Sequence, residues 1–381
     1  MRLLFVTQDF PPAIGGIQTY SWELARRLSQ WTEQLRVIAP TAEQENSVSG
    51  AEDFEVTRLP ARPDLLVLPA LAHIPVWAAR HQPDVAFHAQ WQTVAASALA
   101  RAVTGWPRHI VCAAHGRELL FNPGDEYPGL GALYDALRRL ALRTVDHFVP
   151  VSRYTAGLLH DQGIPSTRTH VLPNGTNPAR FTPENGTRIR EQLDCIEQPM
   201  LLTVGRLVPR KGIDTVLRAL PSVLQSVPDL TYVVVGTGPD RARLEGVADA
   251  CGVREHVHFA GSVPHEDLPS VYSAADIFVM PSREAPPDVE GFGIVFLEAN
   301  ACETPVIGAR SGGIPDAIVD EETGLLVPPS DPTALTDALV QLLEEPHIAE
   351  TLGAQGRERV LREASWDRVA EQLFERLSML T

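Results

Sequence analysis

The chain has 381 residues, a formal net charge of −16 at pH 7, and 21% charged and 44% hydrophobic residues. That length predicts two domains, because one domain usually holds about 100–200 residues. The acidic balance argues against a nucleic-acid partner, which needs a basic surface, and no run approaches the ~18 apolar residues of a membrane span. The apolar first residues continue into Asp9-Phe10-Pro11-Pro12 without a basic leader, which predicts a first strand and a cytoplasmic protein.

Short apolar runs alternate with longer amphipathic segments in the first half of the chain, a pattern typical of strand–helix units around a parallel sheet. The predicted strands are Leu3–Thr7, Leu35–Ala39, Glu55–Leu59, Val85–His88, His109–Ala114, His147–Val151 and His170–Leu172. The predicted helices are Gln18–Ser29, Thr93–Val103, Leu130–Arg143 and Tyr154–His160. We assign residues 1–173 to an N-terminal, doubly wound domain.

The stretch 174–198 is rich in turn-forming residues, and we predict the hinge between two domains there. The same alternation then resumes in residues 199–364, which predicts a second doubly wound domain. Its predicted strands are Met200–Gly205, Leu230–Gly236, Val257–Gly261, Ile277–Met280, Pro305–Gly308 and Gly324–Val327. The helices predicted after the hinge are Ile213–Gln225, Asp240–Ala250, Leu268–Ala274, Ile294–Asn300, Pro332–Glu344 and Ser365–Leu380.

The turn after the first strand contains Gly15 and Gly16 just before a helix. Ligands of such sheets bind at the carboxyl ends of the strands, and glycines there let backbone N–H groups approach a phosphate at the helix start. A plain flexible turn is the alternative. His115 follows the strand His109–Ala114 and is a candidate catalytic residue, although a lone histidine is more often structural.

The first turn of the second domain runs from Gly205 to Gly212 and contains Arg206 and Lys211. A guanidinium and an ammonium at one strand end are suited to grip a diphosphate. Lys211 is the single lysine among 32 basic residues, so its survival at this position favours a specific role. A solvated basic turn is the alternative.

The segment Glu290 to Glu298 holds Gly291 and Gly293 at the start of an apolar helix. The amides of Phe292 to Ile294 would form an anion-binding helix start. The two carboxylates would accept hydrogen bonds from sugar and ribose hydroxyls. The alternative is a core helix with two surface acids. Another glycine-rich turn, Gly312-Gly313, is expected to line the same pocket.

No pair of aspartates is spaced as D-x-D, the arrangement that holds a divalent ion against a sugar diphosphate. We therefore expect neither a metal nor a cofactor, with the nucleotide sugar acting as a substrate. The cysteines Cys112, Cys195, Cys251 and Cys302 lie far apart and include no C-x-x-C pair, which predicts reduced, structural thiols.

These motifs resemble, in order and spacing, the retaining glycosyltransferases of family 4. The resemblance spans nearly the whole chain, and the element from Glu290 to Glu298 is its most specific part. Two stretches, 7–18 and 288–299, are similar in particular to bacterial phosphatidylinositol mannoside mannosyltransferases. The resemblance implies the GT-B fold, with two doubly wound Rossmann-like domains facing each other across a cleft. It also implies that the last helix, 365–381, crosses back onto the N-terminal domain.

The resemblance further implies roles for individual residues. Arg206 and Lys211 would bind the diphosphate and stabilise its departure, with help from the Gly16 loop. Glu290 would contact the donor sugar and Glu298 the ribose. His115 would lie near the sugar carbon at which transfer takes place. The acceptor, a saccharide or a lipid-linked glycan, would bind the N-terminal domain.

Several alternatives remain open at this stage. GDP-mannose is the favoured donor, and UDP-glucose, UDP-GlcNAc or UDP-glucuronate are its rivals. A sugar-nucleotide epimerase on the same fold, a non-catalytic binding protein and a nicotinamide-dependent dehydrogenase are further readings; the last is weak because Arg241 replaces the third glycine of the 236–241 fingerprint. Arg138, Arg139 and Arg143 on one predicted helix would either touch an anionic membrane at its inner face or be solvated.

Overall fold

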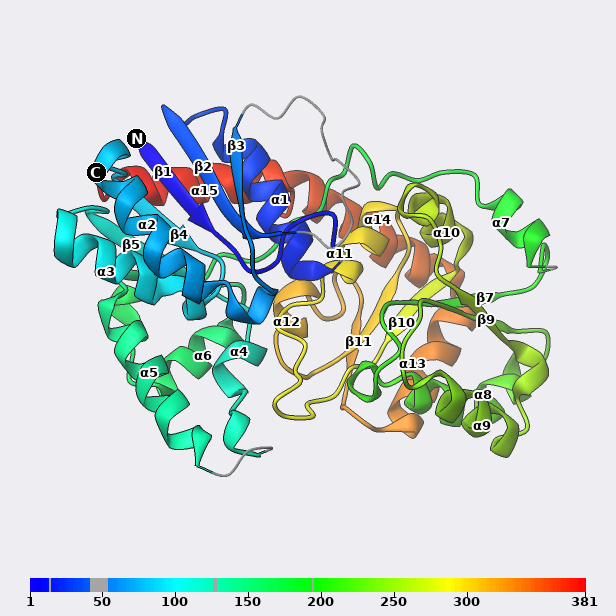
Figure 1. The fold of residues 1–381 in the computed structure, drawn as a ribbon. Coiled ribbons are helices and arrows are strands. Elements are labelled where there is room, and N and C mark those ends of the chain that lie inside the picture. Colours follow the sequence, from blue (N-terminus) through cyan, green and yellow to red (C-terminus); the bar gives the residue numbers. More distant parts are fainter. Residues whose placement is uncertain (14, 42–53, 126–128, 194) are drawn as a thin grey trace. The chain divides into compact units, whose positions relative to one another are not determined.

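The computed structural model describes residues 1–13, 15–41, 54–125, 129–193 and 195–381. They form two compact units, one of Met1–Asn174 with Trp366–Thr381 and one of Gly175–Ser365 (Figure 1). Each unit is built on a six-stranded sheet flanked by helices, so the predicted α/β class is confirmed. Residues 175–198, most of the predicted hinge, cluster with the second unit and include a helix, α7. A hinge describes motion between two conformations, so its position stays a prediction.

The first unit contains a parallel sheet with the strand order β3-β2-β1-β4-β5-β6. Its strands are β1 (Arg2–Val6), β2 (Gln34–Pro40), β3 (Glu55–Leu59), β4 (Val85–His88), β5 (His109–Ala114) and β6 (His147–Pro150). Its helices are α1 (Gly16–Leu28), α2 (Val67–His81), α3 (Val94–Thr104), α4 (Arg117–Leu120), α5 (Leu130–Thr144), α6 (Arg153–Asp161) and α15 (Trp366–Ser378). Single 3-10 turns are η1 (Pro63–Leu65), η2 (Trp91–Thr93), η3 (Pro123–Asp125) and η4 (Ser166–Arg168).

The second unit has a parallel sheet with the order β12-β11-β10-β7-β8-β9. Its strands are β7 (Met200–Val204), β8 (Thr231–Val235), β9 (Val257–Gly261), β10 (Ile277–Met280), β11 (Val306–Ala309) and β12 (Leu325–Val327). Its helices are α7 (Thr187–Gln192), α8 (Ile213–Ser226), α9 (Arg241–Ala250), α10 (Leu268–Ala274), α11 (Ile294–Ala301), α12 (Ile314–Ala317), α13 (Pro332–Glu344) and α14 (Pro346–Arg362). Its 3-10 turns are η5 (Pro209–Lys211), η6 (Arg254–His256) and η7 (His265–Asp267).

The two sheets share one topology. When the strands of each unit are counted from its first, both follow the order 3-2-1-4-5-6 of a doubly wound Rossmann fold. The direction of winding reverses between β1 and β4 in the first unit and between β7 and β10 in the second. Crevices at such reversal points are where doubly wound sheets bind ligands. The chain therefore offers two binding points of the same kind, one in each unit.

The central strands are buried on both faces, as parallel sheets covered by helices must be. Strand β7 is an example, because all five of its residues, Met200–Val204, are buried. The core of the second unit joins this sheet to the apolar side of α8, including Val216, Leu220 and Val223, each fully buried. Continuous apolar strands and amphipathic helices are what made these elements predictable from sequence.

The final helix α15 packs against α1 within the first unit. Trp366 is 1% exposed and meets the ring of Tyr20 at 6.0 Å between centroids. Arg27 Nε donates to Asp367 Oδ1 at 2.6 Å. The sheet, α1 and α15 thus belong to one compact unit, although more than 190 residues separate α15 from the rest of that unit in the sequence.

Some elements differ from the prediction. The strand predicted at His170–Leu172 is wrong: the segment donates two backbone hydrogen bonds to β6, and then Pro173, which has no N–H, ends the pairing. The predicted helices did not include α2, α7 and α14 or the one-turn helices α4 and α12. Helix α2 contains Pro75 and apolar residues on most sides, so it shows little helical periodicity.

Candidate active site

The turn after β7 and the loop after β10 are joined by their backbones at the reversal point of the second sheet. Gly212 has φ +71°, and a Cβ there would lie 2.1 Å from the carbonyl oxygen of Pro281. Arg283 N donates to the carbonyl of Arg210 at 2.8 Å. Only glycine permits this close approach. The turn that carries Lys211 is therefore fixed against the segment that leads to Glu290.

Lys211 and Glu290 form a buried ion pair at this point. Lys211 Nζ donates to Glu290 Oε2 at 2.6 Å, and Arg210 Nη1 donates to the same oxygen. The Lys211 and Glu290 side chains are 9% and 13% exposed. Burial would raise the pKa of Glu290, but the charges of Lys211 and Arg210 outweigh it and lower the pKa to about 2. Glu290 is thus ionised at every physiological pH.

The Lys211 ammonium folds back over Gly205. Its Nζ lies 3.8 Å and its Cε 3.5 Å from the place that a Cβ on Gly205 would occupy. Burial lowers the pKa of Lys211 below its usual range, although Glu290 acts in the opposite direction. A lysine held this way is desolvated and pre-positioned, which strengthens its attraction for an anion.

Arg206 comes from the same turn but is exposed. Among the residues that the structure describes, its guanidinium has no hydrogen-bond or ion-pair partner. Arg206 is therefore available to an anionic ligand, whereas Lys211 must first share its ion pair with Glu290.

Two glycines of the 236–241 fingerprint serve to pack this turn. A Cβ on Gly236 would lie 1.9 Å from the carbonyl oxygen of Gly205, and one on Gly238 would lie 2.2 Å from that of Leu207. Leu207 N also donates to Thr237 O at 2.9 Å. These close contacts explain why glycine occupies both positions, without a bound dinucleotide.

The start of α11 lies directly after Glu290. Gly293 is the residue before the helix, with φ +94°, and no side chain caps the helix start. The first amides, those of Phe292 to Ile294 by position, are the groups that helix starts leave without intrahelical partners. The turn 312–313 holds Glu290 from behind: Gly313 N donates to the Glu290 carbonyl at 2.8 Å, and Gly312, with φ +55°, has no room for a Cβ beside it.

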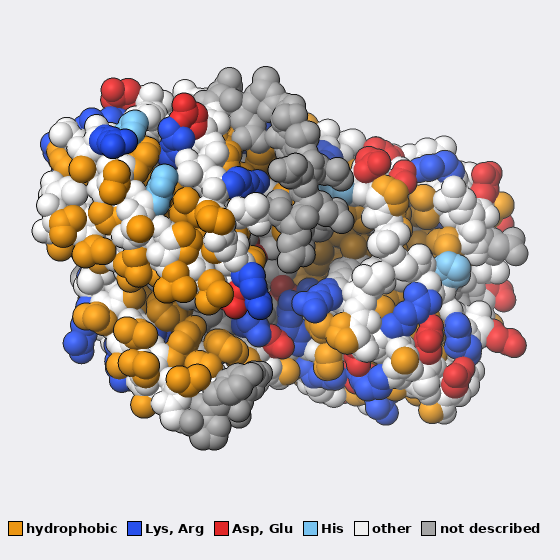
Figure 2. Space-filling view, in the orientation of Figure 1, with side chains coloured by type: hydrophobic (Ala, Val, Ile, Leu, Met, Phe, Trp, Pro, Cys, Tyr) orange, Lys and Arg blue, Asp and Glu red, His pale blue; other side chains and the backbone are white. Residues whose placement is uncertain are grey.

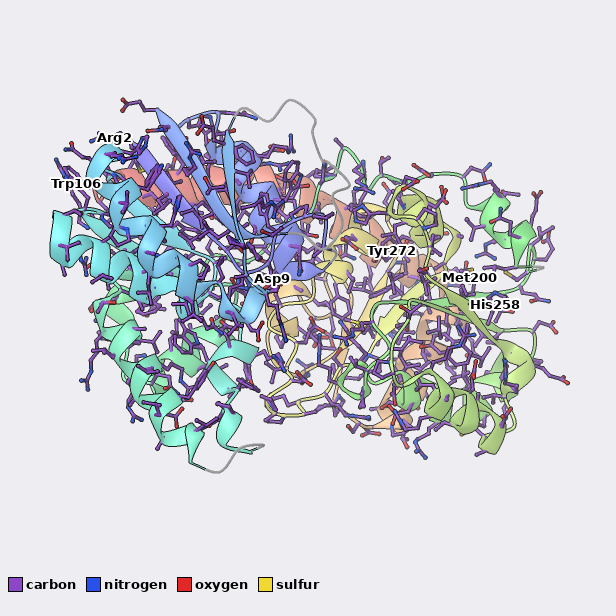
Figure 3. The ribbon with its side chains drawn as sticks, viewed as in Figure 1. Arg2, Asp9, Trp106, Met200, His258 and Tyr272 are labelled. Atoms are coloured by element: carbon purple, nitrogen blue, oxygen red, sulfur yellow. The ribbon has the colours of Figure 1, made fainter. Side chains whose placement is uncertain are left out.

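Glu298 lies inside α11 and is buried. The Tyr272 hydroxyl of α10 (Figure 3) donates to Glu298 Oε2 at 2.7 Å. Burial raises the pKa of Glu298, and the hydrogen bond from Tyr272 opposes that shift. The ribose contact remains a prediction for this residue.

Asp9 is the centre of a polar cluster at the reversal point of the first sheet. It follows β1 (Figure 3), and Gln90 follows the neighbouring strand β4. Gln18 Nε2 donates to Asp9 Oδ1 at 2.6 Å, and Gln90 Nε2 donates to Oδ2. Burial raises the pKa of Asp9, with Gln90 and His115 acting against it.

Gly15 precedes α1, and Gly16 is its first residue. A Cβ on Gly15 would meet the Gln18 side chain at 2.4 Å, whereas one on Gly16 would meet nothing within 4 Å. Packing within the structure therefore gives no reason for glycine at position 16. Open space beside a helix start is what a close-approaching ligand would use.

His115 follows β5 and is half-buried. Its ring meets Tyr20 edge-on at 4.8 Å, and its Nε2 is buried without a partner among the described residues. Glu118 Oε1 accepts hydrogen bonds from the N–H groups of His115, at 2.6 Å, and Gly116. Burial lowers the pKa of His115 to about 4, against the opposing charge of Asp9. The imidazole is thus neutral and suited to hydrogen-bond a hydroxyl.

This pKa makes a prediction about pH. Because His115 loses its proton near pH 4, we expect kcat/KM to show no inflection near pH 6.5 that depends on this residue. Rate measurements from pH 5.5 to 8 on the wild type and on His115→Asn test it. An inflection near pH 6.5 that disappears in the variant would mean that the histidine works as an ordinary acid or base.

The sequence pointed to one group in each unit and missed others. The structure brings together Lys211, Glu290, Gly205 and the 291–294 segment in the second unit. The groups not singled out from the sequence were Arg210, Asp9, Gln90 and Glu118. The strand-end rule could have found Gln90, which follows the predicted strand Val85–His88 by two residues.

The described residues form neither a metal cluster nor a membrane-spanning helix. No group of three His, Cys, Asp or Glu side chains there is placed to hold a metal ion. No described helix combines the length and the apolar character needed to cross a membrane.

Comparisons with known proteins cover both units. Glycosyl transferases group 1 matches residues 187–359, and glycosyltransferase family 4 matches residues 14–180. A GDP-mannose-dependent alpha-(1-6)-phosphatidylinositol monomannoside mannosyltransferase of Mycolicibacterium smegmatis is 37% identical over 99% of this chain and 98% of its own. A GDP-mannose-dependent monoacylated alpha-(1-6)-phosphatidylinositol monomannoside mannosyltransferase of Corynebacterium glutamicum is 34% identical over 98% of this chain and 96% of its own.

Solved structures agree. Sucrose-phosphate synthase from Thermosynechococcus elongatus has a TM-score of 0.84 at 25% identity, covering 100% of this chain and 99% of that one. Anabaena HepE in complex with UDP has a TM-score of 0.82 at 21% identity over the whole of both chains, which shows the fold alone. The predicted GT-B fold is confirmed. The chain belongs to glycosyltransferase family 4 and is a retaining glycosyltransferase.

Proposed function

We propose that this enzyme transfers an α-mannosyl residue from GDP-mannose to a lipid-linked acceptor of the phosphatidylinositol mannoside class. The names of relatives that are 34–37% identical over the full chain support this donor and acceptor. The structural observation that carries the proposal is the cluster of Lys211, Arg210 and Glu290 beside the uncapped start of α11. At this reversal point of the sheet, two cationic side chains and the first amides of α11 could bind phosphate, and the Glu290 carboxylate could accept hydrogen bonds from sugar hydroxyls.

The donor's diphosphate would take the cationic groups. Arg206, which has no partner among the described residues, would bind it first. Lys211 would then donate one of its hydrogen bonds to a phosphate oxygen in place of Glu290. The first amides of α11 add the positive end of a helix dipole. Glu290 is ionised, so it cannot favour phosphate, but it can accept hydrogen bonds from mannose hydroxyls.

Transfer with retention proceeds on one face of the sugar. The bond between the mannose anomeric carbon and the β-phosphate oxygen breaks, and a bond forms from the acceptor hydroxyl oxygen to the same carbon. The acceptor proton passes to the departing phosphate oxygen, and GDP leaves. Lys211 and Arg206 would stabilise the charge that develops on that oxygen. In the first unit, Asp9 and Nε2 of His115 would bind sugar hydroxyls.

We propose that the leaving group needs no divalent ion. Arg206 and Lys211 supply two positive charges, and Arg210 adds a third that partly offsets Glu290. Turnover should therefore persist in excess EDTA at nearly the untreated rate, measured as GDP release. Abolition of activity by EDTA, with recovery on adding Mg²⁺ or Mn²⁺, would contradict this part of the proposal.

A donor screen tests the reaction itself. Radiolabelled GDP-mannose, UDP-glucose, UDP-GlcNAc and UDP-glucuronate are each offered with a phosphatidylinositol mannoside in detergent micelles. We expect label in the lipid only with GDP-mannose and an α-anomeric product by NMR. Transfer of label from a UDP-sugar would show that the donor is that sugar nucleotide and not GDP-mannose. Conversion of a nucleotide sugar to its epimer in the absence of acceptor would indicate an epimerase.

We further propose that the first unit works at the surface of a membrane that holds the acceptor. Of the three arginines that the sequence suggested for this contact, Arg138 is wrong. It is 6% exposed, pairs with Asp135 at 2.6 Å and donates to the carbonyls of Leu119 and Phe121. Arg139 and Arg143 of the same helix are exposed.

A further inference from the structure

Helix α5 has an exposed side that is apolar as well as a buried one. Its buried side holds Gly131, Arg138, Ala141 and Leu142. Four leucines at successive spacings of three, four and three residues lie on the exposed side. They are Leu130, Leu133, Leu137 and Leu140, with 50%, 58%, 52% and 61% of their surfaces exposed. We call this row the leucine face.

The leucine face belongs to a wider apolar surface. Figure 2 shows hydrophobic side chains covering the side of the first unit that carries α2, α3 and α5. Exposed residues there include Leu68 and Val76 of α2 and Leu99 and Val103 of α3. A contiguous apolar surface of this kind marks a contact with a partner or a membrane, whereas scattered exposed leucines do not.

The charges of these helices are the reverse of the chain's. Helices α2, α3 and α5 together carry five arginines and one aspartate, a net charge of +4, in a chain whose net charge is −16. The aspartate, Asp135, is paired with Arg138. Arg139 and Arg143 flank the leucine face and have no ion-pair partner within the described part of the chain. Leucines beside arginines, without free acids, are typical of a helix that lies in a membrane interface.

We infer that the leucine face of α5 is a docking surface for an anionic lipid membrane, with its leucines inserted among the acyl chains and Arg139 and Arg143 at the headgroups. The inference rests on the lipid-linked acceptor of the proposed function and adds the surface that reaches it. A second copy of the chain is the weaker occupant, because a two-fold contact through this face would bring the arginines of both copies together.

Vesicle sedimentation tests the docking surface. Full-length protein is mixed with vesicles of phosphatidylcholine alone or of phosphatidylcholine with phosphatidylglycerol. The wild type should sediment with the anionic vesicles. Leu133→Gln combined with Leu137→Gln should weaken binding at least ten-fold, and Arg139→Gln combined with Arg143→Gln should abolish the preference for anionic vesicles.

Leu361→Gln is the matched control, because Leu361 of α14 in the second unit is 54% exposed, close to the 52% of Leu137. Thermal unfolding checks that every variant is folded. Leucine variants that bind vesicles as the wild type does would overturn the inference. The inference would also be overturned if sedimentation equilibrium without lipid showed that the wild type is a dimer and that the leucine variants are monomers.

Transfer assays separate this inference from the proposed function. With the acceptor embedded in vesicles, the leucine variants should lose activity in step with binding; with the acceptor in detergent micelles, they should match the wild type. Vesicle binding without mannosyl transfer in either medium would refute the function and leave the surface standing. Transfer in micelles by a wild type that never binds vesicles would refute the surface and leave the function.

Discussion

Replacing Lys211 with alanine should lower kcat by about 10²–10³-fold, the usual loss when one pre-positioned donor to a developing negative charge is removed. The ammonium is buried over Gly205 and points at the oxygen of Glu290, so no water can take its place at equal strength. Steady-state rates of GDP release measure the effect.

The fold should survive this change, because Arg210 continues to pair with Glu290. Arg218→Ala is the control: Arg218 is the exposed arginine of α8 in the same unit, and its loss should leave kcat unchanged. Lys211→Arg should not restore full activity, since a planar guanidinium does not reproduce the position of the compact ammonium that donates to Glu290. A kcat of Lys211→Ala near that of the wild type would show that Lys211 does not stabilise the leaving group.

Replacing Glu290 with glutamine should separate binding from turnover. The amide keeps the shape of the side chain but loses the charge that accepts from Lys211 and Arg210. We expect kcat to fall at least ten-fold, because hydroxyl recognition is weakened. The affinity for GDP should stay equal or rise, since Lys211 no longer has to leave a carboxylate to reach the diphosphate.

The same variant should lose stability in a way that depends on pH. The folded-state pKa of Glu290, about 2, lies below its ordinary value, so its stabilisation is present at neutral pH and is lost as pH falls toward 2. We expect a cost on the order of 2 kcal/mol at pH 7 and a smaller difference from the wild type below pH ~4.5. Urea unfolding measures both.

The exposed pair Arg362–Glu358 gives the control for this stability effect. Its replacement by Glu358→Gln should cost less than about 1 kcal/mol at any pH. If Glu290→Gln is as stable as the wild type at pH 7, the buried pair does not hold the site together. If it also binds GDP more weakly, Glu290 does not compete for Lys211.

Sequence patterns predicted most strands because buried parallel strands are continuous apolar runs. His109–Ala114, Val85–His88 and Ile277–Met280 have the predicted bounds. Helix α14 was not predicted because it contains Gly353 and Gly356, and glycine disfavours helices. Its packing requires them: a Cβ on Gly353 would lie 2.0 Å from Glu303 O, and one on Gly356 2.4 Å from Asn300 Nδ2.

The site could be predicted where residue type alone indicates the chemistry. It could not be predicted where it depends on how side chains are oriented in the fold. Lys211 stood out as the single lysine. That Arg210 shares an oxygen with it follows from the 3-10 turn of η5, which no spacing rule gives. The pairing of Asp9 with Gln90, 81 residues away, depends on β1 and β4 being neighbours in the sheet. Strand order is the information that the sequence alone withholds.

The central claim, that a diphosphate is held by Lys211 and its neighbours without a metal, is tested most directly by calorimetry in EDTA. GDP and GMP are titrated into the wild type and into Lys211→Ala. We predict that the wild type binds GDP at least ten-fold more tightly than GMP and that the variant loses most of this difference. Equal affinities for GDP and GMP in the wild type, or a preference for GDP that the variant keeps in full, would contradict the account.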